Sequence, residues 1–405
     1  MAICPGCSLL CEDIEIIPKA GAESQAKNLC RRGTGHFKAL NAERTMPMVG
    51  SKEVSIDEAI SSAAELLKAA KSPLLYGWSN SSLEAQRLGI DLAKKLGATI
   101  DDPSSFCQGS FMDMILRGKV PTCTLDDVRN FADVVIFWGS DPVNSQPRHL
   151  SRFSYYPRGE KRQKGYEEDR TSIALDVRKS ATAKLCKHYV RIPPGGDGEF
   201  IEALTSVLDG KVPKFGDKKK MIEIGTILRR AEFGVIFPGP GLAHSLKDRM
   251  DLFEAFVSKL NGASKFKVLP VVDHYNCRGF NQLMLDETGY INMVSFKDGV
   301  SHGPEHGVVQ ASKSCDAALV IGSDPLSSTP FGVARSLAKV PLVAINPRRT
   351  LTTDAAKVVL PSAYYGLEAG GRALRMDGAK IEFEPLLESD RLSDEEMLLR
   401  LMEVI

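Results

Sequence analysis

The sequence predicts a multi-domain α/β protein with two Rossmann-like parallel-sheet units behind a small cysteine-rich N-terminal domain. Apolar runs of strand length alternate with amphipathic helical stretches from about residue 56 to residue 350, as in parallel sheets crossed by helices. One strand-and-turn signature also occurs twice. Four cysteines lie within the first 30 residues, and a chain of 405 residues is long enough for two or three packed domains.

The individual elements follow from the spacing of the apolar residues. Helices are expected at residues 56–70 and 83–96, and strands at 14–17, 74–77 and 99–100. Charged, exposed loops are expected at 155–170 and 211–220. These elements suggest four consecutive domains, at 1–50, 51–210, 211–360 and 361–405.

A strand that ends in Gly-Ser-Asp-Pro occurs at residues 133–142 and again at 316–325, and each copy is followed by a second strand with a basic turn. Ligands of open α/β sheets bind at the carboxyl ends of the strands. A single such turn is more typical of a simple strand end, but the duplication favours two nucleotide-binding halves. The candidate binding residues are Gly139, Ser140, Asp141, Pro142, Gly322, Ser323 and Asp324, with Asp176 and Arg178 at the end of the strand after the first copy.

Several other functions are disfavoured. Neither turn is a G-x-G-x-x-G or a P-loop, so neither ordinary NAD binding nor ATP hydrolysis is indicated. The net charge of +1 is unlike that of a nucleic-acid-binding protein. No apolar run is long enough for a membrane span. The N-terminus lacks the regions of a secretory signal, so a cytoplasmic location is expected, where cysteines stay reduced.

Cys4, Cys7, Cys11 and Cys30 form a C-x2-C-x3-C-x18-C pattern. Three closely spaced thiolates and a fourth from further along suit a 4Fe–4S cluster. A four-cysteine zinc site is the main alternative, although zinc ribbons usually pair two short knuckles. A third interpretation is that the four cysteines are free and have a structural role. Arg31 and Arg32 follow the last cysteine, either as a solvated basic pair or as a bridge to an anionic cofactor.

Cys107 stands in a polar, turn-rich segment over residues 101–109, where a buried structural cysteine is not expected. A loop thiol beside Ser and Gly suits a soft metal ligand or a nucleophile. The residues alone favour neither the functional nor the structural role.

Together these features resemble the molybdopterin oxidoreductase superfamily, and within it the B subunit of formylmethanofuran dehydrogenase. The resemblance covers almost the whole chain, from Cys4 to about Gly378. It is closest at residues 121–125, 138–142, 147–152, 274–276, 279–282 and 287–290. It implies a multi-domain molybdopterin oxidoreductase-like fold with a small N-terminal iron–sulfur domain.

The resemblance also implies the cofactors. It assigns the 4Fe–4S cluster to the four N-terminal cysteines, and a tungsten or molybdenum ion to Cys107 and two molybdopterin guanine dinucleotides. The dinucleotides would bind at the two Gly-Ser-Asp-Pro turns and at Asp176, Arg178, Asn346 and Arg348. Arg32 takes the place of the basic residue that lies between cluster and pterin in the family.

The reaction that the resemblance implies is the reversible reduction of CO2 to formate for formylmethanofuran synthesis, with electrons delivered through the cluster. The expected partners are an amidohydrolase-like subunit and ferredoxin-like electron-transfer subunits. Two alternatives are a non-redox scaffold subunit of a formyltransferase/hydrolase-type complex and a related formate dehydrogenase-like oxidoreductase.

Two candidate catalytic positions depart from the family's pattern. Gln108 stands where His commonly follows the metal-binding Cys, and an amide hydrogen-bonds but does not shuttle protons near neutral pH. Asp298 stands where the family has an Arg that would hold formate, and a carboxylate would repel that anion. His302 and His306 lie close by in the sequence.

Overall fold

The protein, analysed as a computed structural model, is described over residues 2–17, 25–38 and 44–405. The chain forms two compact units. One comprises Met1–Ser105, His274–Arg375 and Lys380–Ile405, and the other Phe106–Asp273 and Met376–Ala379. These units differ from the expected consecutive domains, because strands far apart in the sequence pair in one sheet. Leu75, for example, lies opposite Leu319.

The first unit is built on a nine-stranded sheet in the order β14-β13-β7-β6-β15-β16-β17-β4-β5. Its five central strands are parallel, and the outer ones are antiparallel. Every residue of β6, β15, β16 and β17 is buried, as expected for strands covered on both faces. The strands are β4 (Met48–Val49), β5 (Lys52–Glu53), β6 (Pro73–Gly77), β7 (Thr99–Asp101), β13 (Val294–Ser295), β14 (Ser301–His302), β15 (Ala317–Ile321), β16 (Leu342–Ile345) and β17 (Val358–Leu360).

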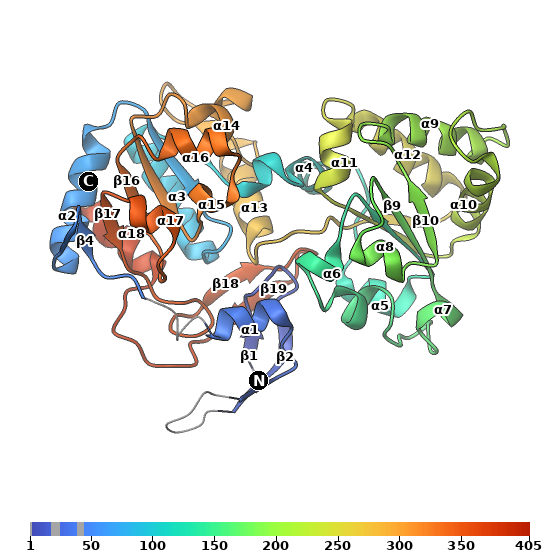
Figure 1. Cartoon of the computed structure of the whole chain (residues 1–405), viewed down its shortest axis with the longest axis horizontal. Helices are drawn as coiled ribbons and strands as arrows, with labels where there is room; N and C mark the ends of the chain where they lie inside the picture. The colour runs from blue at the N-terminus through green and yellow to red at the C-terminus, as the bar shows by residue number, and fades with distance from the viewer. Residues whose placement is uncertain (1, 18–24, 39–43) are drawn as a thin grey trace. The chain divides into compact units, whose positions relative to one another are not determined.

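The helices of the first unit confirm the two that the sequence predicts. Helix α2 (Ile56–Ala69) begins after Ser55, whose side chain caps it, and α3 (Leu83–Leu96) ends at the left-handed Gly97. Helix α17 packs against strand β16, and α15 packs against both α16 and α17 (Figure 1). The further helices are η2 (Pro103–Phe106), α13 (Cys277–Thr288), η4 (Pro304–His306), α14 (Val308–Ala311), α15 (Pro325–Ser328), α16 (Phe331–Leu337), α17 (Leu351–Ala355) and α18 (Asp394–Val404).

The second unit has a five-stranded parallel sheet in the order β10-β9-β8-β11-β12. Its strands are β8 (Val134–Trp138), β9 (Thr171–Asp176), β10 (His188–Arg191), β11 (Gly234–Pro238) and β12 (Phe266–Val268). Its helices are α4 (Gly109–Leu116), α5 (Leu125–Phe131), α6 (Pro142–Ser145), η3 (Leu150–Ser154), α7 (Tyr166–Asp169), α8 (Ala181–Leu185), α9 (Asp197–Leu208), α10 (Lys218–Arg230), α11 (Pro240–Leu246) and α12 (Met250–Ala263).

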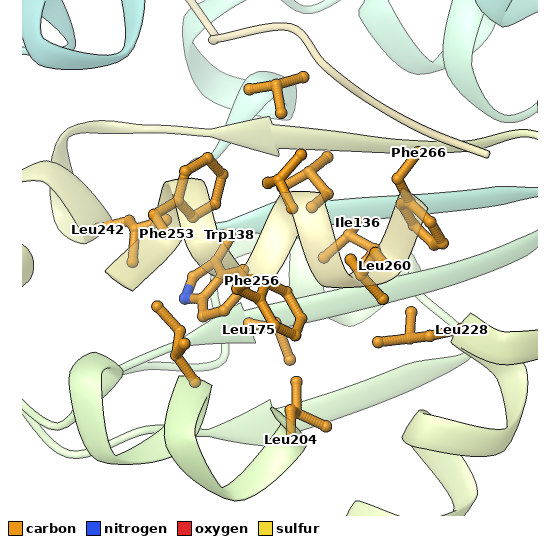
Figure 2. Packing of buried hydrophobic residues seen from close by; sticks show 14 of the residues in the cluster. Ile136, Trp138, Leu175, Leu204, Leu228, Leu242, Phe253, Phe256, Leu260 and Phe266 are labelled. Carbon is orange, nitrogen blue, oxygen red and sulfur yellow. The ribbon is translucent and has the colours of Figure 1, made fainter. Parts of the chain in front are cut away.

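The core of the second unit is centred on Trp138, at the end of β8. Its ring packs edge-to-face against Phe253 and Phe256 of α12, as Figure 2 shows. Its indole N–H donates to Asp197 at 2.6 Å, so the buried polar edge of the ring is satisfied. This packing fixes the end of β8, from which the first Gly-Ser-Asp-Pro turn leaves.

Two small sheets complete the first unit. Strands β1 (Ala2–Cys4), β2 (Cys11–Ile17) and β3 (Gln25–Lys27) form one, with α1 (Arg31–Lys38) following, and β18 (Gly371–Leu374) pairs with β19 (Lys380–Phe383). The strand expected at residues 14–17 is thus part of β2. The two expected loops each contain helical residues: α7 lies in the first, and α10 begins in the second after Asp217 caps its N-terminus.

Within the described part of the chain, no helix is both long enough and apolar enough to cross a membrane.

Candidate functional site

The two Gly-Ser-Asp-Pro turns adopt the same backbone conformation after their strands. Gly139 and Gly322 have φ values of +57° and +55°, a left-handed region that favours glycine. At Gly139 a Cβ atom would lie 2.4 Å from the backbone nitrogen of Leu242, so a side chain is excluded there. The backbone N–H of each glycine donates to the last residues of the next strand, at Leu175 and Ile345. The repeat in the sequence is therefore a repeat in structure.

In each turn the aspartate is held by the chain itself. Asp324 Oδ1 accepts from the backbone N–H of Thr352 at 3.0 Å and from its hydroxyl at 2.6 Å. Asp141 Oδ1 accepts from Thr182 at the same two distances. One oxygen of each carboxylate thus joins its turn to the helix after the next strand, α8 for Asp141 and α17 for Asp324. That these aspartates also contact a nucleotide stays a prediction.

The residues at the ends of the next strands make equivalent hydrogen bonds in the two units. Asp176 Oδ1 accepts from the backbone N–H of Arg178 at 3.3 Å, and Asn346 Oδ1 accepts from that of Arg348 at 3.2 Å. Burial raises the pKa of Asp176, and the backbone N–H groups of Arg178 and Val177 partly oppose this rise. One half thus carries a carboxylate where the other carries an amide.

A cavity of about 520 Å³ lies in the first unit, at the carboxyl edge of its sheet. This volume is in the range of small-molecule and cofactor sites. The cavity brings together all of the predicted binding residues of this unit: Arg32, Gly322, Ser323, Asp324, Asn346 and Arg348. Pro5 and Gly6 of the cysteine-rich segment line the same cavity.

Two buried tyrosines line this cavity, and sequence reasoning missed them as site residues. The hydroxyls of Tyr275 and Tyr364 are buried without a hydrogen-bond partner among the residues that the structure describes. Burial raises the pKa of both hydroxyls, so they stay protonated and can donate. An unpaired buried hydroxyl is costly, so these groups fit a polar ligand that would accept from them.

The wall of the cavity contains two further titratable groups that sequence reasoning missed. Burial lowers the pKa of His36 to about 4, so its ring is neutral at pH 7, and its Nε2 lies 3.0 Å from the carbonyl of Tyr365. Asp394, at the start of the C-terminal helix α18, is buried and accepts from the hydroxyl of Ser81 at 2.8 Å. Tyr275 belongs to a motif of the family resemblance, but neither His36 nor Asp394 carries a sequence signal.

The N-terminal cysteines lie on a hairpin. Cys4 and Cys11 face each other across β1 and β2, and Cys7 lies in the turn between them. The backbone N–H of Gly6 donates to the Cys4 sulfur at 3.4 Å. Burial is the main cause that raises the pKa of the Cys7 thiol, and the Cys11 and Cys4 thiols raise it further. The three sulfurs therefore share one environment, and Cys30 directly precedes α1.

This donor set fits a metal cluster by its chemistry. Two glycines allow the chain to pack closely around these cysteines. A Cβ on Gly33 would lie 3.0 Å from the Cys4 sulfur, and one on Gly6 would lie 3.1 Å from the Gly33 nitrogen. Across residues 2–17, 25–38 and 44–405, however, no three Cys, His, Asp or Glu side chains are arranged around a single metal ion. Arg32 joins this segment to the cavity, because its Nε donates to the Gly6 carbonyl at 3.0 Å.

Cys107 and Gln108 follow the short helix η2 and precede α4. Cys107 is partly exposed, and Gln108 is buried at the N-cap position of α4, with no side-chain capping bond. They belong to the second unit, as do Ser140, Pro142 and the other residues of the first turn. Ser140 donates to the carbonyl of Phe237 at 2.8 Å, so its hydroxyl is used within the fold.

Asp298 does not line this cavity, and its catalytic role stays a prediction. It is exposed in the turn between β13 and β14. Strand β13 runs antiparallel to β7, so the turn lies beside the amino end of β7, and the neighbouring Lys297 donates to Ser72 at 3.2 Å. The cavity lies at the opposite, carboxyl edge. His302 and His306 belong to the same hairpin region, where His302 stacks on Tyr290 and His306 bonds Ser301.

Comparison with known proteins agrees with this geometry. No family model matches the chain. The chain is 35% identical over 418 residues to the B subunit of tungsten-containing formylmethanofuran dehydrogenase 2 of Methanocaldococcus jannaschii, covering 98% of this chain and 96% of that one. The same protein of Methanococcus maripaludis is 34% identical over 429 residues, covering 100% and 98%.

More distant proteins share the fold. The B subunit of the formyltransferase/hydrolase complex of Methylorubrum extorquens is 24% identical over 277 residues, or 67% of this chain and 72% of that one. A solved structure of that complex with methylofuran has a TM-score of 0.71 at 21% identity, covering 88% of this chain and 98% of its own. Acetylene hydratase of Pelobacter acetylenicus has a TM-score of 0.69 at 13% identity, covering 100% and 69%.

Sequence identity of 34–35% over the full length shows that these proteins are homologous. The duplicated turns and the cavity are consistent with this relationship. The chain belongs to the family of formylmethanofuran dehydrogenase B subunits.

Proposed function

We propose that this chain is the redox subunit of a formylmethanofuran dehydrogenase, which reduces CO2 to formate reversibly at a tungsten or molybdenum centre with two pterin guanine dinucleotides. The observation that carries the proposal is the cavity of the first unit. It combines the second glycine turn, two cations and two unpaired buried hydroxyls in one place. Tungsten is the favoured metal because both full-length relatives are named for it.

The residues of the cavity fit an anionic dinucleotide. Arg32 and Arg348 line it and carry permanent charges suited to phosphate oxygens. Tyr275 and Tyr364 would donate hydrogen bonds to acceptors of the ligand, and the backbone at Gly322 allows a close approach. The equivalent turn of the second unit, at Gly139, would hold the other dinucleotide.

When bound, the metal and its pterins supply the electron transfer, and the protein supplies binding and orientation. Cys107 would provide the protein thiolate, and Cys4, Cys7, Cys11 and Cys30 would hold a 4Fe–4S cluster. The buried amide of Gln108 can donate a hydrogen bond beside Cys107, but it cannot release a proton near neutral pH. The partners would be an amidohydrolase-like subunit and ferredoxin-like subunits that bring electrons.

A second candidate is a scaffold subunit without redox chemistry, as part of a formyltransferase/hydrolase-type complex. It is favoured by Gln108, which replaces a proton-shuttling residue, and by the fold shared with the Methylorubrum complex. The retained cysteines favour the redox subunit, because a scaffold does not need them.

Metal analysis of the anaerobically purified complex separates the two. A redox subunit should carry about four irons, together with one tungsten or molybdenum per chain. Iron without either heavy metal would contradict the catalytic role. Zinc alone, or no metal, would contradict the redox proposal altogether and support the scaffold.

A further inference from the structure

Asp101 and Asp102 end strand β7 and begin the segment that leads to Cys107. Both side chains are fully buried. Carboxylates are rarely buried without a paired cation. In the part of the chain that the structure describes, the hydrogen-bond partners of these two are hydroxyl, thiol and backbone N–H groups instead.

Asp102 binds the first serine of the 3-10 helix η2. One of its oxygens accepts from the hydroxyl of Ser104. The other accepts from the hydroxyl of Ser79 at 2.6 Å and from the thiol of Cys277 at 3.4 Å. Asp102 thereby ties η2 to the segment after β6 and to the start of α13.

Ser104 is itself held from two further sides. Its oxygen accepts from the amide groups of Asn281 at 2.9 Å and Asn292 at 2.7 Å. Both asparagines are buried. A serine in a short helix therefore has a defined position, because three side chains from separate segments bind its hydroxyl.

Asp101 binds the next serine in the same way. Its Oδ2 accepts from the hydroxyl of Ser105 at 2.8 Å and from the backbone N–H of Val308 at 2.7 Å. Its Oδ1 accepts from the backbone N–H of Met293 at 3.2 Å, a residue held at a φ of +50°. Asp101 thus connects η2 to α14 and to the segment before β13.

We propose that Asp101 and Asp102 are positioning residues for the segment that leads to Cys107, which they hold through Ser105 and Ser104. The inference rests on the proposed function, in which the Cys107 thiolate binds the metal. Each carboxylate accepts from three donors. An asparagine at either position would offer one acceptor oxygen in place of two.

Simple capping of a strand end does not require this arrangement. Asp316 provides the comparison, because it accepts from the backbone N–H groups of Lys71 at 2.7 Å and Ser72 at 2.9 Å at the amino edge of the same sheet. That carboxylate is exposed, and its two hydrogen bonds come from backbone groups. Asp101 and Asp102 instead accept hydrogen bonds from the side chains of Ser105 and Ser104, the second of which lies three positions before Cys107.

The test compares Asp102→Asn, Ser104→Ala and Ser105→Ala with Asp316→Asn in the purified complex. Hydrogen–deuterium exchange over residues 103–110 and the rate of Cys107 alkylation are measured. We expect exchange in that peptide to rise by about tenfold or more in the first three variants, since each loses a buried hydrogen bond. Cys107 should also be alkylated faster. The control Asp316→Asn should leave both unchanged.

Ser104→Thr retains a hydroxyl and should restore slow exchange, which a general loss of packing would not allow. If Asp102→Asn does not fold, the two serine variants decide, because each removes a single hydroxyl. Wild-type exchange and alkylation in all folded variants would overturn the inference. Absence of tungsten and molybdenum from the wild-type complex would refute the proposed function instead, and the exchange data would still show whether the Cys107 segment is held.

Discussion

Thr352 donates its hydroxyl to Asp324 at 2.6 Å, and Thr182 does the same to Asp141 in the other half of the molecule. Both threonines are buried, and each hydroxyl also accepts from a backbone N–H of the helix after the turn, at Leu326 and at Val143. Each glycine turn is therefore locked to the helix that follows the next strand. This lock gives the aspartate a structural role in both copies of the turn.

Thr352→Val should weaken the second turn while keeping the size of the side chain. A hydrogen bond to a charged group contributes about 1.5–3 kcal/mol, and its loss should loosen the cavity around Gly322. We expect the complex to bind less guanine dinucleotide, so that less guanine nucleotide is released when it is denatured. The first turn should be unaffected. Thr182→Val should have the matching effect in the other half.

Thr226→Val is the control for both variants, because its hydroxyl bonds the carbonyl of Ile222 within a helix away from both turns. Guanine nucleotide released by acid hydrolysis is the measurement. An unchanged content in Thr352→Val would show that the lock does not shape a dinucleotide site.

The sequence reveals the two repeated turns because the signal is local. A glycine with a positive φ, an aspartate and a proline must be consecutive to form the turn, so both copies are visible in the sequence. The role of Asp324 is not visible, because its partner Thr352 belongs to the next strand-to-helix connection. For the same reason Asp394 could not be foreseen, since it reaches the cavity from a helix near the end of the chain.

The unit boundaries could not be predicted for a related reason. Strand β6 pairs with β15, although about 240 residues separate Leu75 from its partner Leu319. Periodicity identifies both as buried strands but carries no information about which sheet each joins. The place of Asp298 could not be predicted on similar grounds, because nearness to a motif in the sequence does not state which edge of the sheet a hairpin occupies.

Cys107→Ala should abolish turnover and lower the tungsten or molybdenum content while leaving iron unchanged. The reason is that a soft thiolate would be lost from the metal but not from the cluster. Cys315→Ala is the matched control, because Cys315 is a partly buried thiol in the other unit. Metal analysis and activity are measured together. Full activity in Cys107→Ala would rule out its role as a metal ligand.

Cys7→Ala should remove the optical and EPR signals of an iron–sulfur cluster. Cys7 lies between Cys4 and Cys11 in the hairpin, so its loss takes one of four ligands. The heavy metal should remain if the pterin sites fold independently. Cys186→Ala serves as control, since that thiol lies in the second unit after α8. An unchanged iron content in Cys7→Ala would contradict the cluster assignment.

His149 should make the stability of the second unit depend on pH. Burial lowers the pKa of His149 to about 3, and its Nδ1 lies 2.9 Å from the hydroxyl of Ser154. The unfolded chain takes up a proton below about pH 6.5, whereas the folded chain does not until about pH 3. The contribution of neutral His149 to the free energy of unfolding is therefore complete above pH 6.5. Between pH 6.5 and pH 3 it is lost by about 1.4 kcal/mol per pH unit as the pH falls.

His149→Asn removes the titrating group and keeps a hydrogen-bonding side chain. In a Trp78→Phe background Trp138 is the only tryptophan left, so its fluorescence reports on the second unit during urea unfolding. The free energy of unfolding should fall less steeply between pH 6.5 and 4.5 in His149→Asn than in its parent. Equal slopes would show that another group controls the acid sensitivity.

Gln108→His tests whether the altered catalytic position limits proton transfer. The side chain of Gln108 is buried, so a histidine there should have a pKa below its usual value of about 6.5. If proton delivery beside Cys107 is limiting, the variant should turn over faster, and its pH–rate profile should gain a limb near or below pH 6.5. Gln282→His, on the exposed face of α13, introduces the same group away from the site and should leave the profile unchanged. The profile of formate oxidation with an artificial electron acceptor is the measurement. A Gln108→His profile identical to that of the parent would mean that the proton reaches the metal site by another route, and that the glutamine is compatible with full redox activity.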